Sequence, residues 1–214
     1  MLKKNNQRPY CGLDDLLSQI EGSNGLACKK IYADYKHLFE TAPGASHNHQ
    51  TWPGGYADHI ADAMNIVSII FDTLDNVRPL VFSKSDALLV IFLHDLEKPF
   101  RYSYDNNGNI LADPKLSNKS AKSNKRLDVI SRYNIQLNEQ QTNALRYVEG
   151  VRESEYSPGA RTMGELASLC HCADTLSARL WYNHPLPEGK DTWEGSTRAN
   201  SLASDIVLSS ELKK

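Results

Sequence analysis

The chain has 214 residues, of which 40% are hydrophobic and 23% are charged, the composition of an ordinary globular protein that can bury a substantial core. Its formal net charge of −2 argues against a protein that coats nucleic acid through an overall basic surface. No apolar run is long enough for a transmembrane helix, and the N-terminal segment lacks the apolar core of a secretory signal, so we expect no membrane partner.

Cysteine usage and chain length set the expected compartment and organisation. The four cysteines match neither a disulfide framework nor a paired zinc module, which favours a reducing, cytoplasmic setting. No internal repeat and no clear linker divides the chain, so we expect one domain over residues 1–214. Its expected parts are N-terminal helices over residues 1–45, a core over about 46–182 and a C-terminal tail over 183–214.

The first half of the chain has mainly helical periodicity. Helices are expected over residues 13–20, 26–39 and 56–74. The segment 41–55 is rich in Gly, Pro, Ser and Asn and is predicted as a loop. Ser83 or Ser85 can cap a further helix, whose apolar run ends at His94. Pro99 opposes continuation of that helix.

The second half of the chain adds one short β element to further helices. Alternating residues flank Asn107 and Gly108, which predicts a small hairpin with a type I′ turn over residues 101–111. A polar, basic segment covers residues 113–126. Helices are expected at residues 125–133, 139–151 and 163–182, with a weaker helical pattern at 201–212. The predicted fold class is therefore all-α, a helical bundle with one minor β-hairpin.

The most apolar segment of the chain leads into two polar residues. Seven apolar residues, 87–93, are followed directly by His94 and Asp95. A carboxylate near a helix C-terminus meets the negative end of the helix dipole, and if it is also buried it needs a proton or a cation. A hydrogen-bonded His–Asp pair that supports the core and a divalent metal bound by both residues are about equally compatible with this pattern.

Two other helices carry ionisable residues where core residues are expected. His59 lies early in the long amphipathic segment, on or near its apolar side, and Asp174 lies in the middle of the last strong helix. Together with His94 and Asp95 they offer imidazole nitrogens and carboxylate oxygens. This mixture of ligands suits Mn, Fe, Co, Ni, Zn or Mg.

The order His59, His94-Asp95, Asp174 resembles the H…HD…D signature of the HD-domain superfamily of metal-dependent phosphohydrolases. The stretch HDLEKP is similar to the HD(I/L)GKP motif of that superfamily. HQTWPGGYADHI is similar to the HHxxPGGLLEHT segment of a subgroup found in some 3′-to-5′ exoribonucleases and relaxase-linked HD domains, and ADTLSAR resembles the last helix of the domain. The resemblance covers about residues 46–180.

The resemblance implies an HD-like helical bundle with a divalent ion bound by four residues. The implied ligands are His59, His94, Asp95 and Asp174. The subgroup carries a pair of histidines where this chain has His49 and Gln50, and further histidines before the last aspartate that this chain lacks. His49 and Glu149 are therefore candidates for an extra ligand, with Glu153 and Glu155 as alternatives to Glu149. We favour one ion held by the four implied ligands, and an extra ligand would allow two.

The resemblance also implies hydrolysis by a metal-activated water, with neighbouring residues in supporting roles. The implied catalytic residues are Asp95, Lys98 and Glu97. Lys98, one turn beyond His94, is the first candidate to offset charge on a phosphate. Glu97 is either a general base that holds a water or, the interpretation we favour, part of a solvated helix end.

Several residues around the expected metal site are candidates for substrate binding. They are Lys98, Arg101, Trp52, Tyr56, Lys122, Lys125 and Arg126. The basic segment that contains the last three is either a solvated loop, as such runs usually are, or a mobile flap that attracts a polyphosphate. Trp52 and Tyr56 either stack on a base or pack the loop against the domain, and the sequence favours neither.

Three functions fit this pattern. The first is a nucleotide phosphatase or phosphodiesterase that hydrolyses a phosphoester or phosphoanhydride bond of a small nucleotide. The second is a 3′-to-5′ nuclease on single-stranded nucleic acid, which is less favoured because no accompanying β domain is visible and the chain is slightly acidic. The third is a non-catalytic HD module that senses or binds a partner, and the intact ligand set argues against it. The sequence does not determine the nucleotide, the metal or the oligomeric state.

Overall fold

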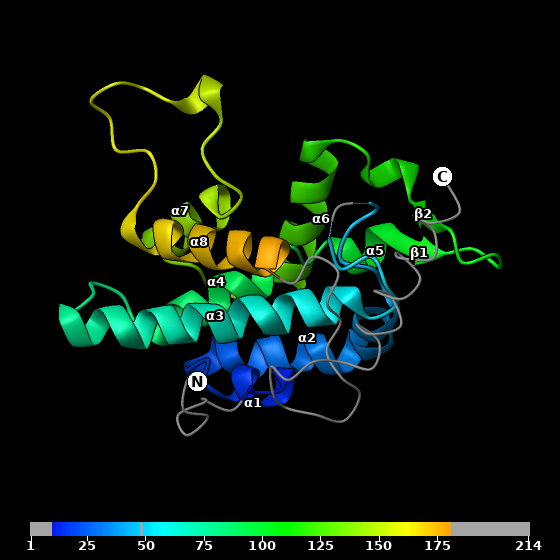
Figure 1. Cartoon of the computed structure of the whole chain (residues 1–214), viewed down its shortest axis with the longest axis horizontal. Coiled ribbons are helices and arrows are strands. Elements are labelled where there is room, and N and C mark those ends of the chain that lie inside the picture. Colours follow the sequence, from blue (N-terminus) through cyan, green and yellow to red (C-terminus); the bar gives the residue numbers. More distant parts are fainter. Residues whose placement is uncertain (1–9, 48, 181–214) are drawn as a thin grey trace, which may run out of the picture.

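The computed structural model describes residues 10–47 and 49–180, which form a helical protein with one small hairpin (Figure 1). The helices are α1 (Leu13–Ser18), α2 (Gly22–Thr41), α3 (Gly55–Val77), α4 (Lys84–Leu93), α5 (Lys98–Arg101), α6 (Lys119–Arg132), α7 (Glu139–Tyr147) and α8 (Glu165–Leu180). The strands are β1 (Tyr102–Tyr104) and β2 (Ile110–Ala112), and short 3₁₀ helices cover Pro114–Leu116 and Glu153–Glu155. The predicted all-α class with a minor hairpin is confirmed. The helical pattern at residues 201–212 and the last residues of the predicted helix 163–182 lie outside the described residues.

Helix α3 lies between α1 and α2 on one side and α8 on the other (Figure 1). Helix α4 packs against α3, α7 and α8, and its residues 87–93 are all buried. A helix that is apolar on every side is stable only inside a protein, so α4 forms the centre of the core. Within residues 10–47 and 49–180, none of the helices combines the length and the apolar composition that a membrane crossing requires.

The loop before α3 ends in two glycines, and each has a structural reason. Gly54 has a φ of +80°, a left-handed conformation that side chains with a Cβ rarely adopt. A Cβ on Gly55 would lie 2.0 Å from the backbone oxygen of Gln50, so no larger residue fits there. The two glycines therefore hold the loop closely against the start of α3, the helix that carries His59.

The start of α4 is fixed by a capping box. The Ser83 side chain accepts a hydrogen bond from the Asp86 N–H, and the Asp86 carboxylate accepts one from the Ser83 N–H. Of the two predicted caps, Ser83 is thus the one used, whereas Ser85 accepts a hydrogen bond from the Glu21 backbone N–H. The cap fixes where α4 begins, and the helix then ends at Leu93, so that His94 is the residue directly after it.

Several predicted boundaries were wrong because tertiary contacts or local caps override the residue preferences. Helix α2 begins at Gly22 rather than at residue 26, and a Cβ on Gly25 would lie 1.9 Å from the Ile20 oxygen, so glycine is required by close packing there. Helix α6 begins at Lys119, so most of the basic segment is helical. The Asn118 side chain caps this helix by accepting a hydrogen bond from the Ala121 N–H.

The predicted hairpin is confirmed, but its predicted turn type is wrong. Strands β1 and β2 pair in antiparallel register, with Tyr102 opposite Ala112. In the turn, Gly108 has a positive φ while Asn107 does not, and a type I′ turn needs both. The Asp105 carboxylate accepts hydrogen bonds from the N–H groups of Asn107 and Asn109, and this side chain fixes a different turn.

Helix α5 was not predicted. The chain turns after α4 and resumes helical geometry at Lys98, with Pro99 in the first turn of the new helix. Proline fits there because the N–H that it lacks would have no partner within the helix. This short helix places Lys98 next to Asp95 and leads directly into the hairpin.

Candidate metal centre

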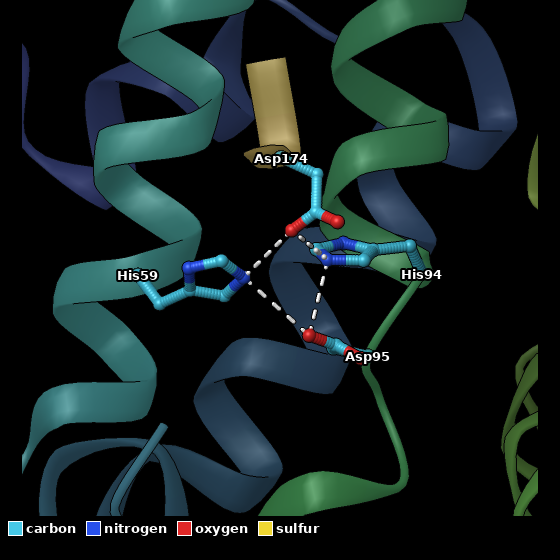
Figure 2. A group of neighbouring side chains, drawn as sticks. All are labelled: His59, His94, Asp95 and Asp174. Atoms are coloured by element: carbon cyan, nitrogen blue, oxygen red, sulfur yellow. Dashed lines mark ion pairs between the residues drawn. The ribbon is translucent and has the colours of Figure 1, made fainter. Parts of the chain in front are cut away.

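Four side chains from three distant parts of the chain meet in the helical core (Figure 2). His59 comes from α3, His94 and Asp95 follow α4, and Asp174 comes from α8. One potential ligand atom from each residue lies within 4.8 Å of the others. Both histidines are fully buried and Asp95 is nearly so, whereas the Asp174 side chain is 19% exposed. Access from solvent therefore lies on the Asp174 side.

Each histidine faces the same two carboxylate oxygens. The distances from His59 Nε2 are 3.4 Å to Asp95 Oδ2 and 3.2 Å to Asp174 Oδ1. From His94 Nε2 they are 3.1 Å to Asp95 Oδ2 and 3.3 Å to Asp174 Oδ1. The two nitrogens and two oxygens therefore surround one common point, as the dashed lines in Figure 2 show.

The Nδ1 atoms of His59 and His94 lie on the far side of each ring, and their hydrogen bonds determine whether the Nε2 atoms that face this point carry a proton. His94 Nδ1 donates to the Ile91 carbonyl oxygen at 2.6 Å, and His59 Nδ1 donates to Ser177 Oγ at 3.0 Å. Ser177 Oγ in turn donates to the His59 carbonyl oxygen at 3.2 Å. In neutral imidazoles with this tautomer, Nε2 carries a lone pair. Both Nε2 atoms are buried without a hydrogen-bond partner, which is costly unless a cation lies between them.

The charges around the cluster also favour a cation. Burial opposes ionisation of Asp95, but His94 and Lys98 outweigh it and lower the pKa of that carboxyl well below its ordinary value. The pKa of Asp174 is lowered in the same way, against burial, by His94 and His59. Although burial opposes a charged imidazole, Asp95 and Asp174 raise the pKa of His94. The potential that attracts a proton to His94 also attracts a metal ion.

Lys98 forms the outer edge of the cluster. Its ammonium group lies 2.5 Å from Asp95 Oδ2, and its side chain is 16% exposed. Burial opposes the charge on this lysine, but Asp95 overcomes that effect and raises the pKa of the ammonium group. Lys98 is therefore a cation held beside the cluster with one side accessible to solvent.

Glu97 is buried, so the favoured interpretation of a solvated helix end was wrong. Its side chain is only 4% exposed, because the turn after α4 folds back into the core. Burial and the neighbouring Asp95 raise its pKa to about 7, although Arg126 acts in the opposite direction. Its Oε2 atom has no hydrogen-bond partner. A buried carboxyl that titrates near neutral pH has the properties of a proton acceptor or donor.

Gln50 and Ser177 support the cluster, and neither was predicted to do so. Gln50 is fully buried with a φ of +43°, and its Nε2 donates to the Ser177 carbonyl oxygen at 3.0 Å. Ser177 contacts His59, so these two residues connect the loop before α3 to α8 and to the metal ligand. In the comparison with the HD subgroup, Gln50 stood out only because it replaces the second histidine of a pair. Ser177, on the same helix as Asp174, had no distinguishing sequence signal.

The two candidates for an extra ligand lie in different environments. The His49 ring centre is 4.9 Å from that of His59, and its Nδ1 contacts Gln50 Oε1. Burial, followed by the charges of His59 and Lys98, lowers the pKa of His49 to about 4, so this ring is neutral at pH 7. Glu149 is exposed and lies outside the group of converging ligand atoms, because α7 ends before it and the chain turns toward solvent. Its predicted role as a ligand is not supported.

The aromatic candidates for substrate binding are both engaged in the protein. Trp52 is half-buried, and its indole N–H donates to Asp58 Oδ2 at 2.6 Å. The Tyr56 ring is fully buried, with its centre 4.9 Å from that of Phe39. Tyr56 is therefore not available to stack on a base, because the first turn of α3 directs it into the core.

The basic candidates lie on α5 and α6. The Arg126 guanidinium donates to the His94 backbone oxygen. The Lys125 ammonium lies 4.1 Å from the centre of the Phe100 ring, and the Arg101 guanidinium lies 4.6 Å from the centre of the Tyr102 ring. Lys122 is half-buried on α6. Of the predicted basic residues, Lys98 and Arg126 thus have direct contacts with the metal-ligand segment.

Comparisons of the chain with protein-family models, with curated proteins and with solved structures found no match.

Proposed function

We propose that this chain is a metal-dependent phosphohydrolase of the HD type, which hydrolyses a phosphoester or phosphoanhydride bond of a small nucleotide. The observation that carries the proposal is the pair of buried Nε2 atoms, on His59 and His94, that lack hydrogen-bond partners. These atoms converge with the carboxylates of Asp95 and Asp174 within 4.8 Å. A divalent ion is the partner that two lone pairs and two carboxylates share most readily.

The ligand set fits a catalytic metal better than a structural one. Two nitrogens and two oxygens suit Mn, Fe, Co, Ni, Zn or Mg, and partial exposure of Asp174 gives small molecules access. When bound, such an ion supplies Lewis acidity toward water and phosphoryl oxygen. One ion fits the four converging atoms, and His49 beside them is the residue that could contribute to a second ion.

Two residues next to the ligands supply the remaining chemistry. Lys98, held by Asp95 and partly open to solvent, would contact a phosphate of the substrate and offset its negative charge. Glu97 would hold a water or accept its proton, because its free oxygen is buried and its pKa is about 7. A nucleotide substrate would therefore meet a cation and a base next to the metal ligands.

The proposal is tested by metal analysis of the purified chain, followed by a phosphate-release screen over nucleotides with several divalent ions. We expect about one bound ion per chain and hydrolysis of at least one nucleotide. Asp174→Asn should lower both the metal content and the turnover, because it removes a charged ligand. Asp15→Asn, at an exposed position on α1, is the matched control and should change neither.

Two outcomes would contradict this assignment. Full metal content and activity in Asp174→Asn would remove Asp174 from the site. Shortening of a labelled single-stranded oligonucleotide, with mononucleotides left intact, would instead indicate the nuclease alternative.

A further inference from the structure

A cavity between α6 and α7 lies outside the metal centre. The segment that follows α7 closes its third side, and its volume is about 610 Å³. Pockets for small organic ligands typically have volumes of about 300–1,000 Å³. The cavity is therefore large enough for a ligand the size of a nucleotide.

The walls of this cavity are strongly basic. Four cations line it, with a single carboxylate among them. The cations are Lys119, Arg126, Arg146 and Arg152. The carboxylate belongs to Glu155, which pairs with Arg146 at 2.8 Å, so it compensates only one of the four charges. An excess of positive charge in a concave surface attracts an anionic ligand.

Part of the lining of the same cavity is apolar. Leu127, Leu137 and Leu145 line it. The Leu127 side chain remains 49% exposed although it lies among charged residues, so the packing of the core does not account for it. A flat ring placed against these leucines would remove apolar surface from water. The ligand that fits both features carries an anionic group and an apolar ring.

Arg126 connects the cavity to the metal centre. It lines the cavity, and its guanidinium also donates to the backbone oxygen of the metal ligand His94. Its Nε atom is a buried donor without a hydrogen-bond partner, so nothing in the protein compensates this part of the guanidinium. The electrostatic influence of Arg126 extends to Glu97, next to the ligands. An anion bound at the Arg126 end would thus lie next to the metal centre.

We infer that the α6–α7 cavity binds a free nucleotide, with its ring against Leu127 and its phosphates between Arg152 and Arg126. This inference rests on the proposed function at one point. The proposed function implies that the phosphate bound at the Arg126 end is the one that is hydrolysed. Binding itself needs no metal, because the cations of the cavity belong to the protein.

The test measures binding without turnover. The full chain in EDTA is titrated calorimetrically with ATP, GTP, CTP and UTP one at a time, and with inorganic triphosphate and the four nucleosides. We expect at least one nucleotide to bind more tightly than both triphosphate and its own nucleoside. Arg152→Ala and Leu127→Asp should each weaken that binding by about tenfold or more, because one removes a charged contact and the other places a carboxylate in the apolar part of the lining.

Matched variants separate binding from folding. Arg152→Lys should restore part of the affinity, and Arg78→Ala, which removes an exposed arginine after α3, should leave affinity unchanged. Unfolding temperatures of all variants are compared with that of the wild type, and Arg152 is exposed, so its replacement should not affect folding. Equal loss of affinity in Arg78→Ala would overturn the inference.

Failure of this inference can be distinguished from failure of the proposed function. Nucleotide binding that depends on Arg152 and Leu127, without hydrolysis under any metal condition, would support the cavity and contradict the proposed function. Hydrolysis with an affinity and a KM that neither variant changes would overturn the cavity assignment alone. Binding of a single-stranded oligonucleotide with no binding of mononucleotides would also overturn it.

Discussion

The carboxyl groups of Asp95 and Asp174, at the candidate metal centre, and that of Asp62, elsewhere in the helical core, have pKa values shifted in opposite directions. At the candidate metal centre, and against the effect of burial, His94 and Lys98 lower the pKa of Asp95, and His94 and His59 lower that of Asp174. At the other place, one turn beyond His59 on α3, burial and the nearby Asp58 raise the pKa of Asp62 well above it. The Tyr10 hydroxyl donates to Asp62 at 3.2 Å, which opposes this effect but does not reverse it.

The difference between the two places lies in the groups that face each carboxyl. Burial and the neighbouring Asp58 keep the pKa of Asp62 raised, because the Tyr10 hydroxyl stabilises a carboxylate less than a cation does. Asp174 has two imidazole nitrogens within 3.3 Å, and these groups can share a metal with it. Convergence of several uncompensated ligand atoms, and not the burial of a single acid, therefore indicates cation binding.

Removal of the metal should have the largest effect. Incubation with EDTA should abolish hydrolysis, because no other group in the cluster offers a comparable Lewis acid. The bound ion should also stabilise the fold by about 2.7 kcal/mol at a concentration 100 times its dissociation constant. Phosphate release and thermal unfolding, measured before and after re-addition of metal, check both expectations. An unfolding temperature that does not respond to any divalent ion would contradict the site.

Replacement of Lys98 should affect catalysis without loss of the metal. Lys98→Ala should reduce turnover by about 10²–10³-fold, because it removes the cation that offsets charge on the phosphate. Metal content should stay as in the wild type, since Lys98 donates no ligand atom. The exposed Lys29 on α2 provides the control, and Lys29→Ala should retain full turnover. If Lys98→Ala keeps wild-type kinetics, Lys98 serves only to balance the charge of Asp95.

Removal of the hydrogen bond between Ser177 and His59 should have an intermediate effect, on metal affinity. Ser177→Ala removes the group that fixes the tautomer of this imidazole, and loss of such a partner typically weakens metal affinity by about 10–100-fold. Competition with a chelator of known affinity measures the change. Ser168→Ala, on an exposed turn of the same helix, should leave the affinity unaltered. Similar affinities in the two variants would mean that Ser177 does not orient the ligand.

The smallest effect is expected at Asp62, on stability alone. A carboxyl whose pKa is raised in the folded state stabilises the fold fully when the pH is below its unfolded-state pKa of about 3.9. This contribution to the free energy of unfolding is lost as the pH rises toward the folded-state pKa. Asp62→Asn does not titrate, so its free energy of unfolding relative to that of the wild type should increase as pH rises above the unfolded-state pKa of the carboxyl. Urea unfolding at several pH values tests this. If the difference in free energy of unfolding between Asp62→Asn and the wild type does not change with pH, the pKa of Asp62 is not raised in the folded protein.

The ligand residues were predictable because they break the helical pattern. His59, His94, Asp95 and Asp174 each occupy a position in or beside an apolar helix, where an ionisable group is unusual and needs a partner. Asp62 breaks the same pattern but was not singled out. The resemblance to a known motif contributed the order of the ligands, and periodicity alone would not have separated the two kinds of buried acid.

The sequence by itself determined the helical class and the hairpin, and it marked the four converging residues as ionisable groups in apolar surroundings, because hydrophobic period and misplaced charge are local properties. Tertiary structure decided the burial of Glu97 and Tyr56, the support of His59 by Ser177, and the α6–α7 cavity. These depend on how helices far apart in the chain pack together, and a serine or an arginine on an amphipathic helix looks the same in the sequence whether it faces water, a ligand or another helix.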